Sequence, residues 1–233
     1  MLAPDPTFLR DDLDAPVMVL SAENDVAGER IGSRRARQPD HAGLVTWEIA
    51  GASHVDAYGL GIGDRDGGTG AADAALFAAM QDPPSSVYSG AIECESPINA
   101  GPHTYVARAA LSHLLKWADG GPPPPSMPPL LVDDLGDGLL RDDSGTALGG
   151  VRTPQVDVPT AVLAGTGQQC AGFCGLFGTT RPFDGELVRH YGDRATFLTR
   201  WHAALDAAVA AGAVLPADAE LLRAAVEGST ILT

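Results

Sequence analysis

Two short apolar segments, each followed by a polar loop, constrain the fold of this chain more than any other feature. Residues 16–20 (PVMVL) and 44–50 (LVTWEIA) have the length and composition of buried strands. The first leads to Asp25 and the second to His54, and the spacing between them leaves room for one crossover connection. We therefore expect two parallel strands of an open α/β sheet, with Asp25 and His54 together at its carboxyl edge.

A carboxylate after one strand and a histidine after the next is the order of the acid and the base in a Ser…Asp…His triad. In such a triad the histidine takes the proton of the nucleophile, and the carboxylate holds the imidazole ring in the required tautomer. Ala22 and Gly51 are small residues that allow tight turns before Asp25 and His54. Glu23 is the alternative acid, and Asp25 is the preferred one.

The serine that would complete the triad is missing from its usual motif. No G-x-S-x-G elbow occurs in the 233 residues. The sequence therefore predicts the acid and the base of a hydrolase without its nucleophile. Two other interpretations stay open, because Asp25 can be a helix N-cap and His54 a hydrogen-bonding loop residue. In that case the chain is a non-catalytic fragment, or a binding or structural protein.

Composition narrows the possible partners and compartments. Hydrophobic residues make up 45% of the chain, as in an ordinary globular protein. The net charge of −15 disfavours nucleic acid and anionic membranes as partners, because both are negatively charged. No apolar run approaches the roughly 18 residues needed to cross a membrane. The first residues lack the basic start and apolar stretch of a signal peptide. Localisation stays open, because an export signal could lie upstream of Met1.

The cysteines and histidines do not form a metal-binding pattern. A zinc site would need four ligands at closer motif spacing than Cys94, Cys170 and Cys174 provide. A disulfide is possible, and Cys170 with Cys174 is the nearest pair. His103 and His113 have no third ligand beside them, so we expect both to be structural or to face solvent. The sequence predicts neither a metal nor a cofactor.

The remainder of the chain alternates helical patterns with glycine-rich and proline-rich connections. One predicted helix, over residues 103–118, carries apolar residues on a single face: Val106, Ala109, Ala110, Leu114 and Trp117. The other predicted elements are helices over 28–37, 71–80, 184–211 (broken near Gly192) and 218–226, and strands over 130–132 and 158–163. Residues 133–150 are expected to form a loop or a hairpin, and residues 165–178 a glycine-rich loop.

Some polar residues outside these elements also have expected roles. Asp56 beside His54 could orient the loop, but it is expected to be an exposed polar residue. Arg152 and Arg181 flank glycine-rich segments, where they can hold loops by bonding backbone carbonyls. The Gly165–Gly167 loop is not a P-loop, because the Gly-Lys-Ser/Thr sequence is absent.

Several weak motifs, taken together, resemble a bacterial family called alpha/beta hydrolase domain-containing proteins. In that family a Trp-Glu-Val-Ala-Gly-x-x-His-x-Asp segment follows the last strand of the sheet, and residues 47–56 (WEIAGASHVD) are similar to it. The resemblance begins at SAENDV and continues through further short segments: residues 97–103 (PINAGPH), 150–154 (GVRTP) and 174–180 (CGLFGTT). It therefore covers most of the chain.

The resemblance implies a fold and an activity. It implies an α/β fold with the last strands and closing helix of an α/β-hydrolase sheet over residues 1–121, and a C-terminal subdomain over 122–233. It also implies that Asp25 and His54 are the acid and base of a carboxylic-ester hydrolase acting on a small-molecule ester. The family's serine elbow and the preceding strands are not in this sequence. We therefore expect the chain to depend on a missing N-terminal half or to associate through an exposed sheet edge.

Overall fold

The two apolar segments form the parallel strand pair that the sequence predicts. The structure is a computed structural model that describes residues 6–28, 31–133, 138–169, 172–183 and 185–233. Strands β1 (Val17–Ala22) and β2 (Leu44–Ile49) pair in parallel, in register from Val17 with Leu44 to Ala22 with Ile49. A short parallel bridge from Ile49 to Val151 extends the pair on the far edge of β2. The expectation of a mixed α/β fold with parallel pairing is confirmed.

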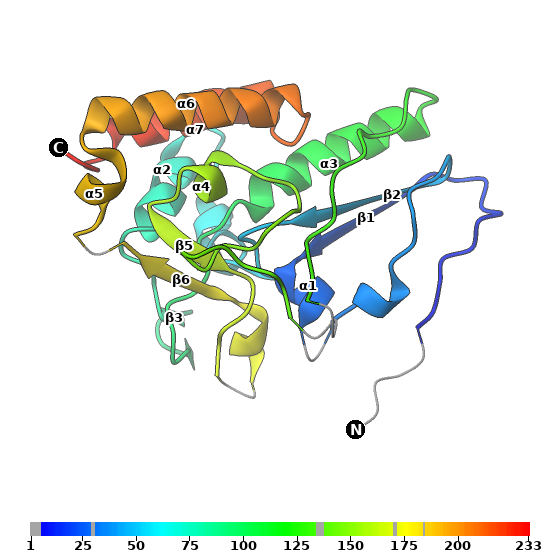
Figure 1. Cartoon of the computed structure of the whole chain (residues 1–233), viewed down its shortest axis with the longest axis horizontal. Helices are drawn as coiled ribbons and strands as arrows, with labels where there is room; N and C mark the ends of the chain where they lie inside the picture. Colours follow the sequence, from blue (N-terminus) through cyan, green and yellow to red (C-terminus); the bar gives the residue numbers. More distant parts are fainter. Residues whose placement is uncertain (1–5, 29–30, 134–137, 170–171, 184) are drawn as a thin grey trace.

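One long helix covers a face of this strand pair. Helix α3 (His103–Ala118) packs on β1 (Figure 1), and it matches the predicted bounds. Val106, Ala109 and Ala110 are buried against the strands, as expected. The Trp47 side chain of β2 is fully buried in the same cluster, and its indole Nε1 donates to the carbonyl oxygen of Pro125 at 2.8 Å. This bond fastens the proline-rich segment after α3 to the sheet.

A second and larger core lies under the C-terminal helices. Helices α6 (Arg194–Ala210) and α7 (Pro216–Gly228) lie side by side in Figure 1, away from the β1–β2 pair. This core is formed by large apolar residues that include Phe77, Tyr105, Phe197, Trp201, Leu205 and Leu222. The predicted break at Gly192 is confirmed, since this residue has a φ of 76° and separates α6 from α5 (Leu187–Tyr191).

The other elements are short. The helical segments are α1 (Glu23–Ala27), η1 (Arg34–Ala36), η2 (Tyr58–Ile62), η3 (Gly63–Arg65), α2 (Ala71–Ala79), α4 (Pro154–Asp157) and η4 (Phe173–Leu176). The antiparallel pairs are β3 (Ser86–Val87) with β4 (Ile92–Glu93), and β5 (Ala161–Ala164) with β6 (Thr179–Pro182). No helix among the described residues has both the length and the apolar character to span a membrane. The division of the chain near residue 121 stays a prediction.

Two predicted elements differ from the structure. The arginine-rich helix expected over 28–37 is reduced to the single 3-10 turn η1, and Gly28 already ends α1 in an extended conformation. Residues 29–30 of that segment lie outside the described residues. The strand expected over 130–132 consists only of isolated bridges, from Leu130 to Gly149 and from Val132 to Leu139.

One edge of β1 has no strand partner within the described part of the chain. The backbone N–H groups of Val17 and Glu23 donate toward the β2 side, to Gly43 and Ala52. Because alternate residues of a parallel strand bond to the same neighbour, the N–H groups of Met18 and Leu20 face the free edge. A free apolar strand edge is a template for pairing with another chain.

We therefore expect the purified chain to self-associate through β1. Met18→Pro removes one outward N–H without breaking the bonds to β2, so it should shift the chain toward monomer. Met18→Ala removes the side chain and keeps the N–H, so it should leave the association largely unchanged. Sedimentation velocity distinguishes the variants, whereas a soluble wild-type monomer that binds no hydrophobic dye would contradict the expectation.

Candidate active site

The expected proximity of Asp25 and His54 is confirmed by the geometry. Asp25 lies in the first turn of α1, which begins directly where β1 ends, and His54 lies in the loop after β2. The Asp25 Oδ1 atom is 2.7 Å from His54 Nδ1. The other carboxylate oxygen, Oδ2, accepts a hydrogen bond from the backbone N–H of Ala22 at 2.7 Å. The carboxylate is therefore held by the helix start and presents one oxygen to the ring.

This contact determines which ring nitrogen is free. An ionised carboxylate accepts hydrogen bonds but cannot donate them. In the contact between Asp25 Oδ1 and His54 Nδ1 the donor must therefore be the ring, so a neutral His54 carries its proton on Nδ1. The opposite nitrogen, Nε2, then has a lone pair that can accept a proton. The His54 side chain is 47% exposed and that of Asp25 is 19% exposed. The imidazole ring is therefore open to solvent on one side, and the carboxylate behind it is partly shielded.

Two serines near this pair in the sequence, Ser53 and Ser33, do not complete a triad. Ser53 is buried and its hydroxyl donates to the carbonyl oxygen of Val55 at 2.9 Å. The Ser33 hydroxyl donates to the backbone carbonyl of Asp25 at 2.8 Å. Both hydroxyl groups are thus engaged with backbone carbonyls rather than with the ring of His54.

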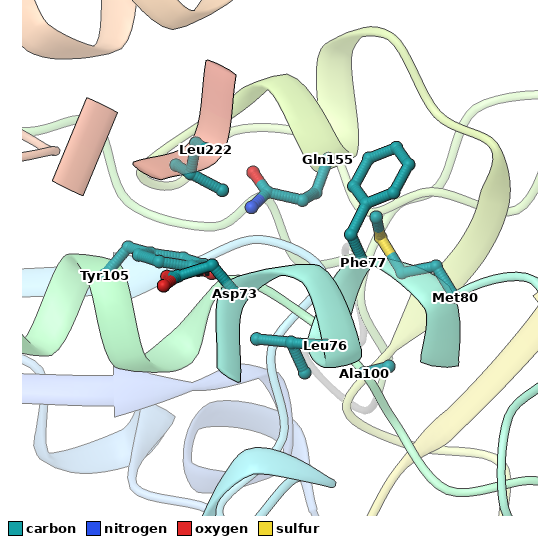
Figure 2. A pocket seen from close by; sticks show the side chains of 8 residues that line it. All are labelled: Asp73, Leu76, Phe77, Met80, Ala100, Tyr105, Gln155 and Leu222. Carbon is teal, nitrogen blue, oxygen red and sulfur yellow. Dashed lines mark hydrogen bonds between the residues drawn. The ribbon is translucent and has the colours of Figure 1, made fainter. Parts of the chain in front are cut away.

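An internal cavity lies elsewhere in the molecule. It lies between α2, α3, α4 and α7 (Figure 2), and its lining residues are Asp73, Leu76, Phe77, Met80, Ala100, Tyr105, Gln155 and Leu222. Its volume of about 10 Å³ is that of a single water molecule, which is too small for an ester. Within the described part of the chain, no group of three or more His, Cys, Asp or Glu residues has a metal-binding arrangement.

Residues 1–224 match the family described as alpha/beta hydrolase domain. The chain belongs to the alpha/beta hydrolase domain family. Among the curated proteins and among the solved structures, no match to the chain is found. The parallel strand pair with an acid after one strand and a histidine after the next agrees with membership in this family.

In this alpha/beta hydrolase domain Glu23 has a structural position. Its side chain is fully buried, and Oε1 accepts the backbone N–H of Gly51 at 2.7 Å. Oε2 accepts the N–H of Gly165 at 2.9 Å and pairs with Arg141 at 2.8 Å. Because α1 begins at Glu23, Glu23 and Asp25 are two residues apart on a helix and point in different directions. The structure therefore places Asp25, and not Glu23, against His54.

The prediction that Asp56 is exposed is wrong. Its side chain is buried, with Oδ1 accepting the backbone N–H of Gly59 at 3.0 Å, while Oδ2 has no hydrogen-bond partner among the described residues. Burial raises the pKa of Asp56, and the N–H of Gly59 and the nearby His103 oppose this shift. The carboxylate is buried because the chain turns into η2 directly after the His54 loop.

Replacing Asp56 with asparagine is expected to stabilise the fold at neutral pH. The raised pKa means that the folded state favours the protonated carboxyl of Asp56. The free energy of unfolding therefore falls as the pH rises from the pKa of this group in the unfolded chain through its higher pKa in the folded chain. Asp56→Asn removes this loss, by roughly 1–3 kcal/mol. Thermal unfolding at several pH values should show the gain near pH 7 and little difference in acid. Exposed Asp64→Asn is the control, and an equal gain at every pH would contradict the assignment to the Asp56 carboxylate.

The disulfide joins different cysteines from the nearest pair. Cys94 and Cys174, which are 80 residues apart in the sequence, are bonded with a Cα–Cα distance of 5.6 Å. A disulfide between two of the three cysteines, which the sequence leaves open, is therefore present, but it does not join the nearest pair. Cys170 lies outside the described residues. Short spacing does not determine disulfide pairing, because the fold brings the end of β4 against η4. The bond anchors η4 to the β3–β4 hairpin.

The structure contains the contacts expected of His113, Arg152 and Arg181. The Nε2 atom of His113 lies 3.1 Å from the carbonyl oxygen of Gly212, which is a structural contact. Arg152 donates to the carbonyl of Ala147 at 3.0 Å. Arg181 donates to the carbonyl of Ser144 at 3.0 Å. These two arginines hold the loop that precedes α4, as the sequence predicts.

Proposed function

We propose that this chain supplies the acid, Asp25, and the base, His54, of a serine carboxylic-ester hydrolase whose nucleophile is not in this sequence. The observation that carries the proposal is the 2.7 Å contact between two side chains that follow neighbouring parallel strands. Membership in the alpha/beta hydrolase domain family supports the reaction class. The order of acid and base along the chain is also that of α/β hydrolases.

The proposed mechanism is acyl transfer through a serine ester. His54 Nε2 takes the proton of the serine hydroxyl as its oxygen attacks the ester carbonyl, and Asp25 stabilises the imidazolium that forms. The imidazolium then gives the proton to the departing alcohol. In the second half of the reaction His54 takes a proton from the water molecule that attacks the acyl-serine. The imidazolium then returns the proton to the serine oxygen as its bond to the acyl carbon breaks, and the carboxylic acid product leaves. Neither step requires a metal or an organic cofactor.

The two oxygens of Asp25 have separate roles in this proposal. Oδ2 is engaged by the backbone N–H of Ala22, so the carboxylate cannot rotate freely about its last bond. Oδ1 is left to accept the proton of His54 Nδ1. The carboxylate therefore holds one orientation of the ring, with Nε2 directed away from it.

Ester hydrolysis by the purified chain tests the proposal. We expect turnover of a p-nitrophenyl ester to be no faster with the wild-type chain than with His54→Ala. The reason is that a positioned acid and base without a serine and an oxyanion hole lose most of the acceleration. Turnover that depends on His54 would instead mean that another residue of this chain is the nucleophile.

The missing elbow favours one alternative, a binding or structural protein without catalysis. The nucleotide sequence upstream of the Met1 codon discriminates between the two. An open reading frame that encodes G-x-S-x-G supports the interpretation that the chain is the C-terminal portion of a hydrolase, or one of two chains that assemble into a hydrolase. An intergenic gap, with no such chain encoded nearby, supports the non-catalytic alternative.

A further inference from the structure

Asn24, between the buried Glu23 and the acid Asp25, contacts the loop that carries the base. Its side chain is 2% exposed. The Oδ1 atom accepts a hydrogen bond from the backbone N–H of His54 at 2.8 Å. The amide nitrogen Nδ2 donates to the backbone carbonyls of Leu176 at 3.1 Å and Gly175 at 3.5 Å. One buried side chain therefore joins α1, the base loop and η4.

The base loop and η4 are also joined directly. The backbone N–H of Val55, the residue after the base, donates to the same carbonyl of Leu176 at 3.2 Å. The Leu176 carbonyl thus accepts from Asn24 and from the base loop. Its own segment is fixed by the Cys94–Cys174 disulfide. Asn24 and η4 together hold the backbone on both sides of the His54 Cα.

This bonding matters because the ring contact tolerates little displacement. The side chain of His54 is half exposed and therefore has little packing to hold it, so its position depends on its backbone. Catalytic geometry requires positions accurate to about 0.5 Å. A loop without the Asn24 bond would allow the Nδ1 atom to leave Asp25 Oδ1, and the ring would then adopt both tautomers.

We propose that Asn24 is a positioning residue for the base: by bonding the His54 backbone N–H it keeps the ring against Asp25 in the Nδ1–H tautomer. The importance of this role for catalysis rests on the proposed function. The structural effect can be measured in the chain without any nucleophile.

The tautomer of His54 can be measured by NMR, from long-range correlations between the ring nitrogens and carbon-bound ring protons. The assignment comes from the resonances lost in His54→Ala, and the pH is held above the range in which the rings are protonated. In the wild-type chain we expect the Nδ1–H tautomer to predominate. In Asn24→Ala we expect its population to fall at least twofold, with exchange between the two forms.

Gln168→Ala is the matched control. The Gln168 amide donates to the backbone carbonyls of Ser96 and Gly178 at 2.8 and 2.9 Å, and accepts the Ser96 N–H at 3.3 Å. It thus makes the same kind of bonds as Asn24 without touching the base loop. We expect Gln168→Ala to lower the melting temperature without changing the His54 tautomer.

Three results would overturn the inference in distinguishable ways. An Nε2–H tautomer in the wild type would remove the acid–base pair and with it the proposed function. A wild-type Nδ1–H tautomer that is unchanged in Asn24→Ala would remove only the role of Asn24. If Asn24→Ala does not fold, the hydrogen exchange of the His54 backbone amide in the wild-type chain shows whether this amide is bonded to Asn24. Protection at least tenfold above that of a free amide supports the bond to Asn24, and free exchange refutes it.

Discussion

Replacing Glu23 with alanine is expected to lower the free energy of unfolding by about 3–5 kcal/mol. The substitution leaves the backbone N–H groups of Gly51 and Gly165 without their acceptor and Arg141 without its partner. Each buried donor left unsatisfied costs about 1–3 kcal/mol. Since Glu23 is fully buried, water cannot replace the lost oxygens without opening the fold.

Urea denaturation followed by circular dichroism measures this loss. Glu23→Gln keeps one acceptor oxygen and loses the charge, so it should fall between the wild type and Glu23→Ala. Glu220→Ala, at an exposed position of α7, is the control and should change stability by less than about 0.5 kcal/mol. A loss below about 1 kcal/mol for Glu23→Ala would contradict a structural role for this carboxylate.

The contrast between Glu23 and Asp25 also shows what the sequence can and cannot predict about this site. The two strands and the proximity of Asp25 to His54 follow from the apolar runs, because parallel strands bring their carboxyl ends to one edge. The choice between the two carboxylates depends on where β1 ends and α1 begins. Helix and strand patterns are least accurate at such boundaries. Strand alternation cannot distinguish Glu23 from Asp25, because residues two apart point to the same face of a strand. The two side chains point in different directions only because both residues lie on α1.

Other features of the site depend on contacts between distant segments. Asp56 is buried where the chain enters η2, and Cys174 of η4 is bonded to Cys94 next to the β3–β4 hairpin. No local pattern around these residues indicates such packing. The long helix α3 was predictable for the opposite reason, since its apolar face repeats at helical spacing. The arginine-rich segment after Gly28 lacks such a face, which is why its helix prediction failed.

The largest effect on activity is expected in a protein that combines this chain with a G-x-S-x-G segment, encoded upstream of Met1 or supplied by a separate chain. In that protein His54→Ala should lower kcat for a p-nitrophenyl ester by about 10⁴-fold, equivalent to about 5.5 kcal/mol of transition-state stabilisation. The proton of the serine then has no acceptor. Asp25→Asn should cause a loss of similar size, because an amide that donates to Nδ1 reverses the tautomer and moves the proton to Nε2.

The double variant His54→Ala with Asp25→Asn provides the sharper test. If the two residues act as one unit, the double variant should be hardly slower than His54→Ala, because Asp25 acts only through the ring. His190→Ala, which removes an exposed histidine of α5, is the matched control and should keep full activity. Losses that multiply in the double variant would mean that Asp25 and His54 contribute independently. Their hydrogen bond would then be a structural contact rather than the acid–base pair of a triad.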